Sequence, residues 1–162
     1  MPLLNYVPSP SGLRKIATTV TVGLTALLLP LGAADAASKA PFVVGNDRGG
    51  YLHERLVELS NLERNGTRVQ IRGQVCYSTC TMFLGLADTC VDPNTTFGFH
   101  GPSQSGRQLS RQQFDYFSQV IANYYPTQLR DWFMEKGRHR TSGIYKMTGN
   151  DLIRMGGVKS CT

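Results

Sequence analysis

The spacing of hydrophobic positions predicts a strand, a glycine turn and a helix at the start of the folded region. Residues 42–44 form a short apolar run that ends at Gly45, which is typical of a buried strand. The glycine pair at residues 49–50 follows. Behind it, hydrophobic residues recur at a helical period until the Asn65-Gly66 turn. These periodic positions are Leu52, Leu56, Leu59 and Leu62.

The middle of the chain continues the alternation of strand and helix patterns. Residues 68–72 alternate apolar and polar side chains, as a half-buried strand does. Residues 79–87 are apolar on most sides and predict a short buried helix. Two further strands are expected at residues 89–91 and 96–99, separated by the turn Asp92-Pro93-Asn94.

The C-terminal part carries three helical patterns. Residues 110–113 have the spacing of a capping box, and the helix behind them ends at Pro126. A short helix is expected around residues 129–134. A second capping pattern at residues 148–151 opens a last helix, which the glycine pair 156–157 closes before a final strand. Strands that alternate with helices predict an α/β domain with a mainly parallel sheet.

Residues 1–36 have the pattern of a secretory signal peptide. Two basic residues precede an apolar run at residues 16–31, and Ala34-Asp35-Ala36 supplies a small-x-small cleavage site. A membrane anchor is the alternative, but Pro30 interrupts the run, which falls short of the roughly 20 residues that span a bilayer. We therefore expect residues 37–162 to form one exported domain, periplasmic or secreted, with no stable membrane span after cleavage.

The net charge is positive without indicating a nucleic-acid partner. The chain carries +6, and removing residues 1–36 takes away two basic residues and one acidic residue, which leaves +5. The basic residues are scattered, with a single cluster at residues 138–140. Because an exported protein meets little nucleic acid, we interpret this charge as a solvated surface.

Four cysteines lie in the expected exported domain, at Cys76, Cys80, Cys90 and Cys161. An oxidising compartment favours two disulfides, and four cysteines allow three connectivities. A zinc site is disfavoured because the chain has no C-x-x-C pair and few histidines. The C-x-x-x-C spacing also differs from that of thiol oxidoreductases. If Cys80 in the predicted helix bridges to Cys90 on the next strand, Cys76 pairs with Cys161.

Ser78 and His100 are the candidate catalytic residues. A serine needs a base within hydrogen-bond reach and donors for the developing oxyanion. Ser78 stands where a strand gives way to a helix, so the amide of Thr79 can point out of the helix start. Gly49 is the preferred second donor, and Gly50 permits the turn. Because strand ends meet at one edge of a parallel sheet, these groups are expected to converge. The alternative is a capping serine and a structural histidine.

The order of these motifs resembles the Clp-protease/crotonase superfamily, especially the proteolytic subunit of Clp protease. In that family a glycine pair supplies an oxyanion donor, a serine begins a buried helix, and a Pro-Asn turn leads through a strand to the catalytic histidine. Gly49-Gly50, Ser78 and residues 92–100 match in order, and residues 151–158 are similar to its closing helix and strand. The likeness spans about residues 42–160. It is closer still to exported bacterial relatives of unknown function that carry a C-x-S-x-C segment.

The resemblance implies a ββα-spiral domain, a serine peptidase activity that uses no cofactor or metal, and a homo-oligomer in rings or trimers. Several aromatic residues near the C-terminus are expected in the core, with some at a subunit interface. They are Phe114, Tyr116, Phe117, Tyr124, Tyr125, Trp132 and Phe133.

Three functions are compatible with the sequence. The first is an exported serine hydrolase that acts on a peptide or acyl substrate through a Ser78–His100 dyad. The second is a non-catalytic binding or scaffold module of the bacterial envelope. It is suggested because residues 141–144 hold no carboxylate where the family has its aspartate, and because disulfides near the serine make a rigid site, which need not be a reactive one. Arg48 also replaces the family's proline, and Asp151 belongs to a capping pattern. The third, weaker alternative is an acyl-thioester enzyme, whose coenzyme A substrates are not expected outside the cytoplasm.

Overall fold

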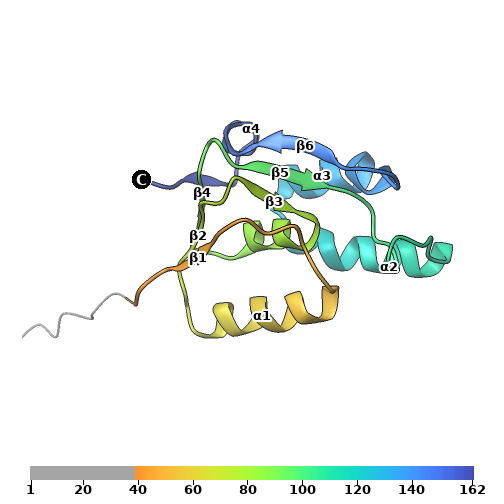
Figure 1. Cartoon of the computed structure of the whole chain (residues 1–162), viewed down its shortest axis with the longest axis horizontal. Helices are drawn as coiled ribbons and strands as arrows, with labels where there is room; N and C mark the ends of the chain where they lie inside the picture. Colours follow the sequence, from red (N-terminus) through yellow and green to blue (C-terminus); the bar gives the residue numbers. More distant parts are fainter. Residues whose placement is uncertain (1–38) are drawn as a thin grey trace, which may run out of the picture. The chain divides into compact units, whose positions relative to one another are not determined.

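The computed structural model describes residues 39–162, so the signal peptide expected at residues 1–36 lies outside the described residues. The described residues alternate strands and helices, which confirms the α/β class (Figure 1). In chain order, the elements are β1 (Phe42–Val44), α1 (Leu52–Arg64), β2 (Val69–Ile71), β3 (Val75–Tyr77), the 3-10 helix η1 (Ser78–Gly85), β4 (Thr89–Val91), β5 (Thr96–Phe99), α2 (Arg111–Ala122), α3 (Thr127–Glu135), the 3-10 helix η2 (Gly137–His139), β6 (Tyr145–Thr148), α4 (Gly149–Met155) and β7 (Lys159–Ser160).

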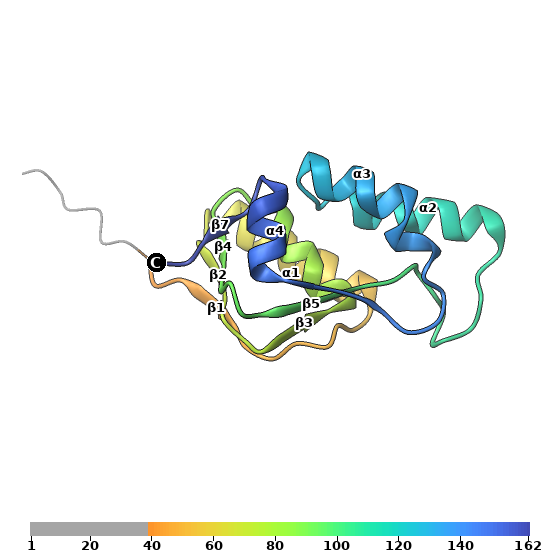
Figure 2. The same cartoon turned by 90° about the horizontal axis from the view of Figure 1, so that it is seen from above.

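The strands form two sheets rather than one. The first sheet has the order β1-β2-β4-β7, and all its neighbours are parallel. The second has the order β3-β5-β6, in which β3 and β5 are parallel and β6 is antiparallel to β5. The expectation of a mainly parallel arrangement holds for the first sheet, whereas the second sheet is mixed. Figure 2 shows the first sheet at one end of the described domain and helices α2 and α3 at the other.

The core fills the space between the sheets and the helices. The helix η1 is its centre, because the residues from Thr79 to Leu84 are all buried and η1 contacts β4, β5, α1 and α2. The short buried helix expected at residues 79–87 is therefore present, wound as a 3-10 helix. The largest apolar side chains that are almost fully buried are Phe83, Phe97, Phe99, Phe133, Leu59, Ile71, Met82, Leu129, Leu152, Val69 and Val91.

Both capping boxes expected from the sequence are present. The Ser110 hydroxyl accepts the Gln113 amide at 3.3 Å at the start of α2. At the start of α4, the Thr148 hydroxyl accepts the Asp151 amide at 3.1 Å, and the Asp151 carboxylate accepts the Thr148 amide at 2.8 Å. None of the helices in residues 39–162 is long and apolar enough to cross a membrane.

Two disulfides form, as expected, but the pairing hypothesis is wrong. The bonds join Cys76 to Cys80 and Cys90 to Cys161, instead of Cys80 to Cys90 and Cys76 to Cys161. The reason is that β4 and β7 are neighbours in the first sheet, which places Cys161 against Cys90 with a Cα–Cα distance of 4.8 Å. Cys76 belongs to the other sheet, and its Cα lies 5.3 Å from that of Cys80. Two disulfides are compatible with an exported protein.

Candidate functional site

Ser78 occupies a sharp turn between a strand and a helix. Strand β3 ends at Tyr77, and η1 begins at Ser78. The backbone of Ser78 has a φ of +56°, and only Ser105 among the other non-glycine residues at positions 39–162 has a positive φ. A non-glycine residue in this region costs energy and persists where its surroundings enforce it. A strained strand-to-helix turn of this kind is how the nucleophile elbow of α/β hydrolases exposes its serine.

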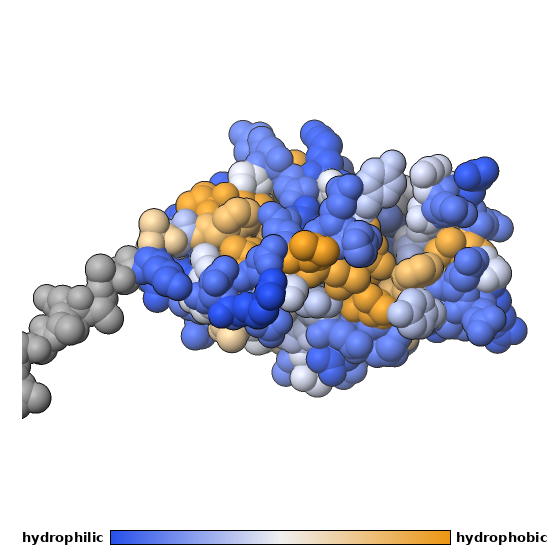
Figure 3. Space-filling model, turned by 90° about the horizontal axis from the view of Figure 1, so that it is seen from below, coloured by the Kyte–Doolittle hydropathy of each residue, from blue (hydrophilic) through white to orange (hydrophobic). Residues whose placement is uncertain are grey.

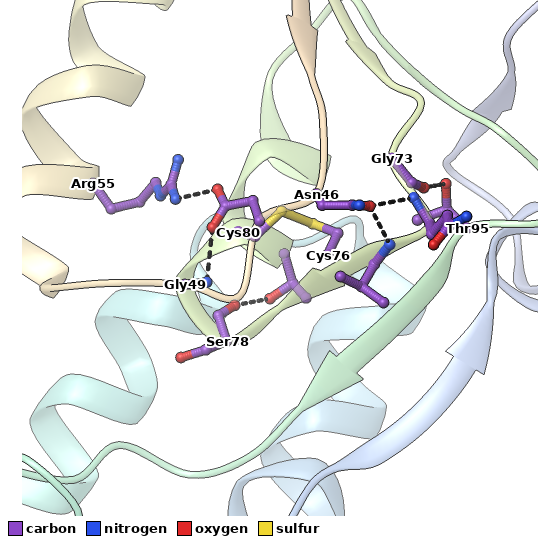
Figure 4. The surroundings of a disulfide bond; sticks show 12 residues. Asn46, Gly49, Arg55, Gly73, Cys76, Ser78, Cys80 and Thr95 are labelled. Atoms are coloured by element: carbon purple, nitrogen blue, oxygen red, sulfur yellow. Dashed lines mark hydrogen bonds and ion pairs between the residues drawn. A yellow bond between two sulfur atoms is a disulfide. The ribbon is translucent and has the colours of Figure 1, made fainter.

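Gly49 lies directly against Ser78. A Cβ atom on Gly49 would stand 2.6 Å from the Ser78 Cβ and 3.0 Å from the Tyr77 carbonyl oxygen, and the φ of Gly49 is +94°. Only glycine fits this close approach without strain. Figure 4 shows Gly49 and Ser78 next to each other, beside the disulfide that joins Cys76 and Cys80.

The amide of Gly49 is engaged by a carboxylate. Asp47 Oδ1 accepts this N–H at 2.7 Å, and Asp47 Oδ2 accepts a bond from Arg55 Nη2 at 2.5 Å. Arg55 is 9 % exposed, pairs also with Glu58 at 2.6 Å, and lies over the Phe83 ring at 4.4 Å from its centroid. Gly49 therefore shapes the turn in this conformation, while its N–H is not free for a substrate oxyanion. Asp47 and Arg55 were not singled out from the sequence, where nothing marks them as neighbours of Ser78.

Two other backbone amides remain available beside Ser78. Gly50 and Thr79 both line the pocket that Ser78 lines, whereas Gly49 does not. Within residues 39–162, no protein group accepts a hydrogen bond from the amide of Gly50 or Thr79. The Thr79 hydroxyl donates to the Gly50 carbonyl at 3.4 Å, which links the glycine turn to the start of η1. This pair of amides can serve an oxyanion in the way that Gly49 and Thr79 were expected to.

His100 follows β5 and is oriented by its own neighbour. Its Nδ1 lies 2.7 Å from the carbonyl oxygen of Gly101. Because a carbonyl can only accept, Nδ1 carries the proton of the neutral ring and Nε2 keeps its lone pair. The position next to His100 must be glycine, since a Cβ there would stand 2.0 Å from the Arg138 carbonyl oxygen. Gly101 is a site residue that sequence reasoning missed.

The parallel pairing of β3 with β5 brings Ser78 and His100 to the same edge of the second sheet. Tyr77 is opposite Gly98 in the register, so the residues that follow each strand leave in the same direction. Both Ser78 and His100 line one pocket of about 730 Å³. No hydrogen bond joins them in the described part of the chain. The expected convergence is present, and the serine and the histidine share a pocket without touching through a hydrogen bond.

The walls of this pocket are uncharged. Apart from His100, no titratable acid or base other than tyrosine lines it within the described residues. One wall is apolar, and the loop after β5 supplies another through residues 101–105. On the face seen in Figure 3, hydrophobic residues form a band with hydrophilic residues on both sides. Outside the loop 101–105, the aliphatic and phenylalanine side chains that line the pocket are Leu52, Phe99, Leu109, Phe117 and Ile121.

A buried hydrogen-bond chain ends at Ser78. The Thr81 hydroxyl donates to the Ser78 carbonyl at 2.7 Å and lies 2.6 Å from the Tyr125 hydroxyl, which then donates to Thr81. Burial raises the pKa of Tyr125 well above its usual range, and the bond to Thr81 opposes this only in part. Tyr125 was expected among the core aromatics. It is buried, and it also lines the pocket together with Thr81.

No acid takes the place that an aspartate has beside the histidine in a catalytic triad, within the part of the chain that the structure describes. Among the described residues, no carboxylate forms a hydrogen bond with His100, whose Nδ1 faces the Gly101 carbonyl. Asp151 is committed to Thr148 and Arg154 in the cap of α4, as its sequence pattern indicated. Nor does any group of three or more His, Cys, Asp or Glu side chains in the described residues have the arrangement of a metal site.

Comparisons with known proteins add no family to this picture. The chain matches none of the models of protein families against which it was scanned. A search of curated proteins also finds no match.

Proposed function

We propose that this chain is an exported serine hydrolase, in which Ser78 is the nucleophile and His100 the general base. The observation that carries this proposal is the strained turn at Ser78, which opens into the same pocket as His100. Holding a serine at positive φ costs about 1–3 kcal/mol. Such strain is concentrated at functional sites, where it presents a side chain in a fixed direction.

In the proposed reaction, Nε2 of His100 removes the proton of the Ser78 hydroxyl as its oxygen attacks the acyl carbon. The amides of Gly50 and Thr79 stabilise the oxyanion. His100 then gives the proton to the leaving group. In the second half of the reaction, His100 removes a proton from the water that attacks the acyl carbon, and returns it to the Ser78 oxygen as the acyl product leaves. The hydrogen bond between Ser78 and His100 forms when substrate closes the site, since such bonds are often loose without it.

The carbonyl of Gly101 takes the orienting role that an aspartate has in a complete triad. It fixes the neutral tautomer of His100, but it supplies no negative charge to stabilise the imidazolium that forms. The proposed enzyme is therefore a dyad with a lower intrinsic rate than a triad. Its substrate is a peptide or another acyl compound with an uncharged group for the pocket, and a Clp-protease/crotonase-like ββα-spiral fold and a homo-oligomeric state are part of this proposal.

The test is labelling of the full-length oxidised protein with a fluorophosphonate, followed by mapping of the labelled peptide. Labelling at Ser78 that disappears in Ser78→Ala and falls strongly in His100→Ala is the expected result. Ser103→Ala is the matched control, because Ser103 lines the same pocket and has no assigned role. A folded protein that is not labelled at Ser78, or that is labelled equally well without His100, contradicts the proposal.

A non-catalytic binding module of the bacterial envelope is the second candidate. It is favoured by two observations on the described residues: no hydrogen bond joins Ser78 to His100, and no carboxylate forms a hydrogen bond with His100. In this function the uncharged pocket holds an apolar segment of a peptide partner. Ser78→Ala then leaves partner binding unchanged, whereas Phe117→Asp places a charge in the apolar wall and weakens it.

A further inference from the structure

The disulfide between Cys76 and Cys80 encloses the proposed nucleophile. Cys76 is on β3, Cys80 is in the first turn of η1, and Ser78 is midway between them. Both cysteines are fully buried, so the cross-link lies beneath the turn, while Ser78 itself lines the pocket. Figure 4 shows this bond immediately beside Ser78.

The cross-link restricts the backbone at Ser78. Four residues in extended conformation span about 13 Å. The disulfide instead holds the Cα atoms of Cys76 and Cys80 5.3 Å apart. The chain must therefore reverse between these residues, and the positive φ of Ser78 is where the strand turns into η1. An extended continuation of β3 through Ser78 is excluded as long as the bond is intact.

The other restraints on this turn are non-covalent. Thr81 donates one hydrogen bond to the Ser78 carbonyl, and Gly49 only makes room for the Ser78 side chain. Neither fixes the distance between the two ends of the turn. The disulfide is the one covalent restraint that does so within residues 39–162.

The second disulfide offers a contrast within the same chain. Cys90 and Cys161 are separated by 71 residues and join β4 to the segment after β7. Neither cysteine lines the pocket that contains Ser78. In the chain-entropy account, a bond that closes a long loop restricts the unfolded chain more than one that closes a short loop. Stabilising the fold is therefore the role that suits Cys90–Cys161.

We propose that the two disulfides have separate roles, and that Cys76 and Cys80 are positioning residues that hold Ser78 in its reactive backbone conformation. This inference rests on the proposed function of Ser78. The Cys90–Cys161 bond secures the C-terminus to the first sheet and leaves the geometry of Ser78 unchanged.

The test compares two paired variants of the full-length protein, Cys76→Ala/Cys80→Ala and Cys90→Ala/Cys161→Ala, by the kinetics of fluorophosphonate inactivation. We expect kinact of the first pair to fall by about 100-fold, as misplacement of a reacting group does. Its KI stays close to that of the parent protein, because neither cysteine lines the pocket. The second pair keeps both constants. An unchanged kinact in the first pair, or equal losses in both pairs, overturns the inference.

Two further measurements keep the outcomes distinct. Circular dichroism and a cooperative unfolding transition show whether each pair is folded, and Cys76→Ser/Cys80→Ser replaces the alanine pair if that pair is not. The coupling between the amide and α protons of Ser78, taken together with the strong intraresidue NOE that a positive φ gives between these two protons, reports φ by NMR without any activity. A parent protein that does not react contradicts the proposed function, and the coupling then decides the inference. A positive φ that persists in the Cys76/Cys80 pair overturns it.

Discussion

Gly49 packs against Ser78 so closely that a methyl group on Gly49 would stand 2.6 Å from the Ser78 Cβ. The two residues come from segments almost thirty positions apart, and their contact brings the glycine turn to the strained serine. The amide of Gly49 donates a hydrogen bond to the Asp47 carboxylate. The contact between Gly49 and Ser78 is thus steric. Within residues 39–162, the pocket-lining residues beside Ser78 whose amides donate to no protein group are Gly50 and Thr79.

Replacing Gly49 by alanine is expected to lower the free energy of unfolding by about 1–3 kcal/mol, because the residue has a positive φ and its Cβ overlaps the Ser78 side chain. Urea denaturation measures this loss. Gly45→Ala is the matched control, since a Cβ at Gly45 meets no atom within 4 Å. Equal stability of the two variants would show that the turn does not require glycine at Gly49.

The hydrogen-bond chain from Tyr125 to Ser78 predicts unequal effects for its two members. Thr81→Val removes the side-chain bond to the Ser78 carbonyl and the side-chain partner of the buried Tyr125 hydroxyl, at a cost of about 1–3 kcal/mol in the free energy of unfolding. Tyr125→Phe removes one hydroxyl and keeps the bond from Thr81 to Ser78, so it costs less, about 0.5–1.5 kcal/mol. Chemical denaturation of both variants and the double variant checks the order. A larger loss for Tyr125→Phe contradicts it.

The two disulfides are expected to differ in their contribution to stability. Cys76→Ala/Cys80→Ala retains the bond that closes a 71-residue loop, and reducing that bond should lower the free energy of unfolding by about 4 kcal/mol. Cys90→Ala/Cys161→Ala retains the bond across four residues, where reduction should cost about 2 kcal/mol. Guanidinium unfolding of each variant, oxidised and reduced, compares the bonds without removing further atoms.

Two results would contradict the disulfide pairing or the expected order of the two contributions to stability. Peptide mapping of the oxidised parent protein could recover Cys80 linked to Cys90, which would exclude the pairing in the structure. Alternatively, reduction could destabilise the short-loop variant more than the long-loop variant. That order would indicate that the Cys76–Cys80 bond is the main restraint on the fold.

Asp151 is expected to make stability depend on pH in acid. The backbone amide of Thr148 donates to its carboxylate, and with the Thr148 hydroxyl and Arg154 this lowers the pKa of Asp151 below the ordinary value of 3.8. Because the folded pKa is the lower one, the stabilisation is present above pH 3.8 and disappears as the pH falls through the folded value. Asp151→Asn should therefore destabilise the protein at neutral pH and have little effect in strong acid.

Urea titrations of the parent protein and of Asp151→Asn, each at neutral pH and in strong acid, measure how the difference in their free energies of unfolding changes with pH. Thr148→Ala is the companion variant, since it removes the hydroxyl that donates to Asp151 and should move the acid transition toward the ordinary pKa. A gap between parent and Asp151→Asn that is the same at both pH values would contradict the assignment.

Much of the fold follows from local sequence patterns. The apolar run at residues 42–44, the leucines of α1 and the capping boxes at Ser110 and Thr148 all give the expected elements. Each of these signals depends on residues within a few positions of one another. The strand β6 was not predicted, because Tyr145 and Met147 are its only hydrophobic residues and three of its four residues are exposed. Its pairing with β5 decides its conformation.

The candidate site divides in the same way. The sequence by itself determined which residues are candidates for catalysis, since a serine at the junction of strand and helix and a histidine after a parallel strand are readable from the order of elements. Tertiary structure alone decided that Ser78 has a positive φ, that Asp47 takes the amide of Gly49, and that Cys76 pairs with Cys80. Asp47 and Gly49 are two residues apart and Cys76 and Cys80 are four apart, so these contacts join near neighbours in the sequence. Whether such neighbours meet depends on the backbone angles of the turns between them, which the surrounding packing enforces and which leave no periodic trace in the sequence.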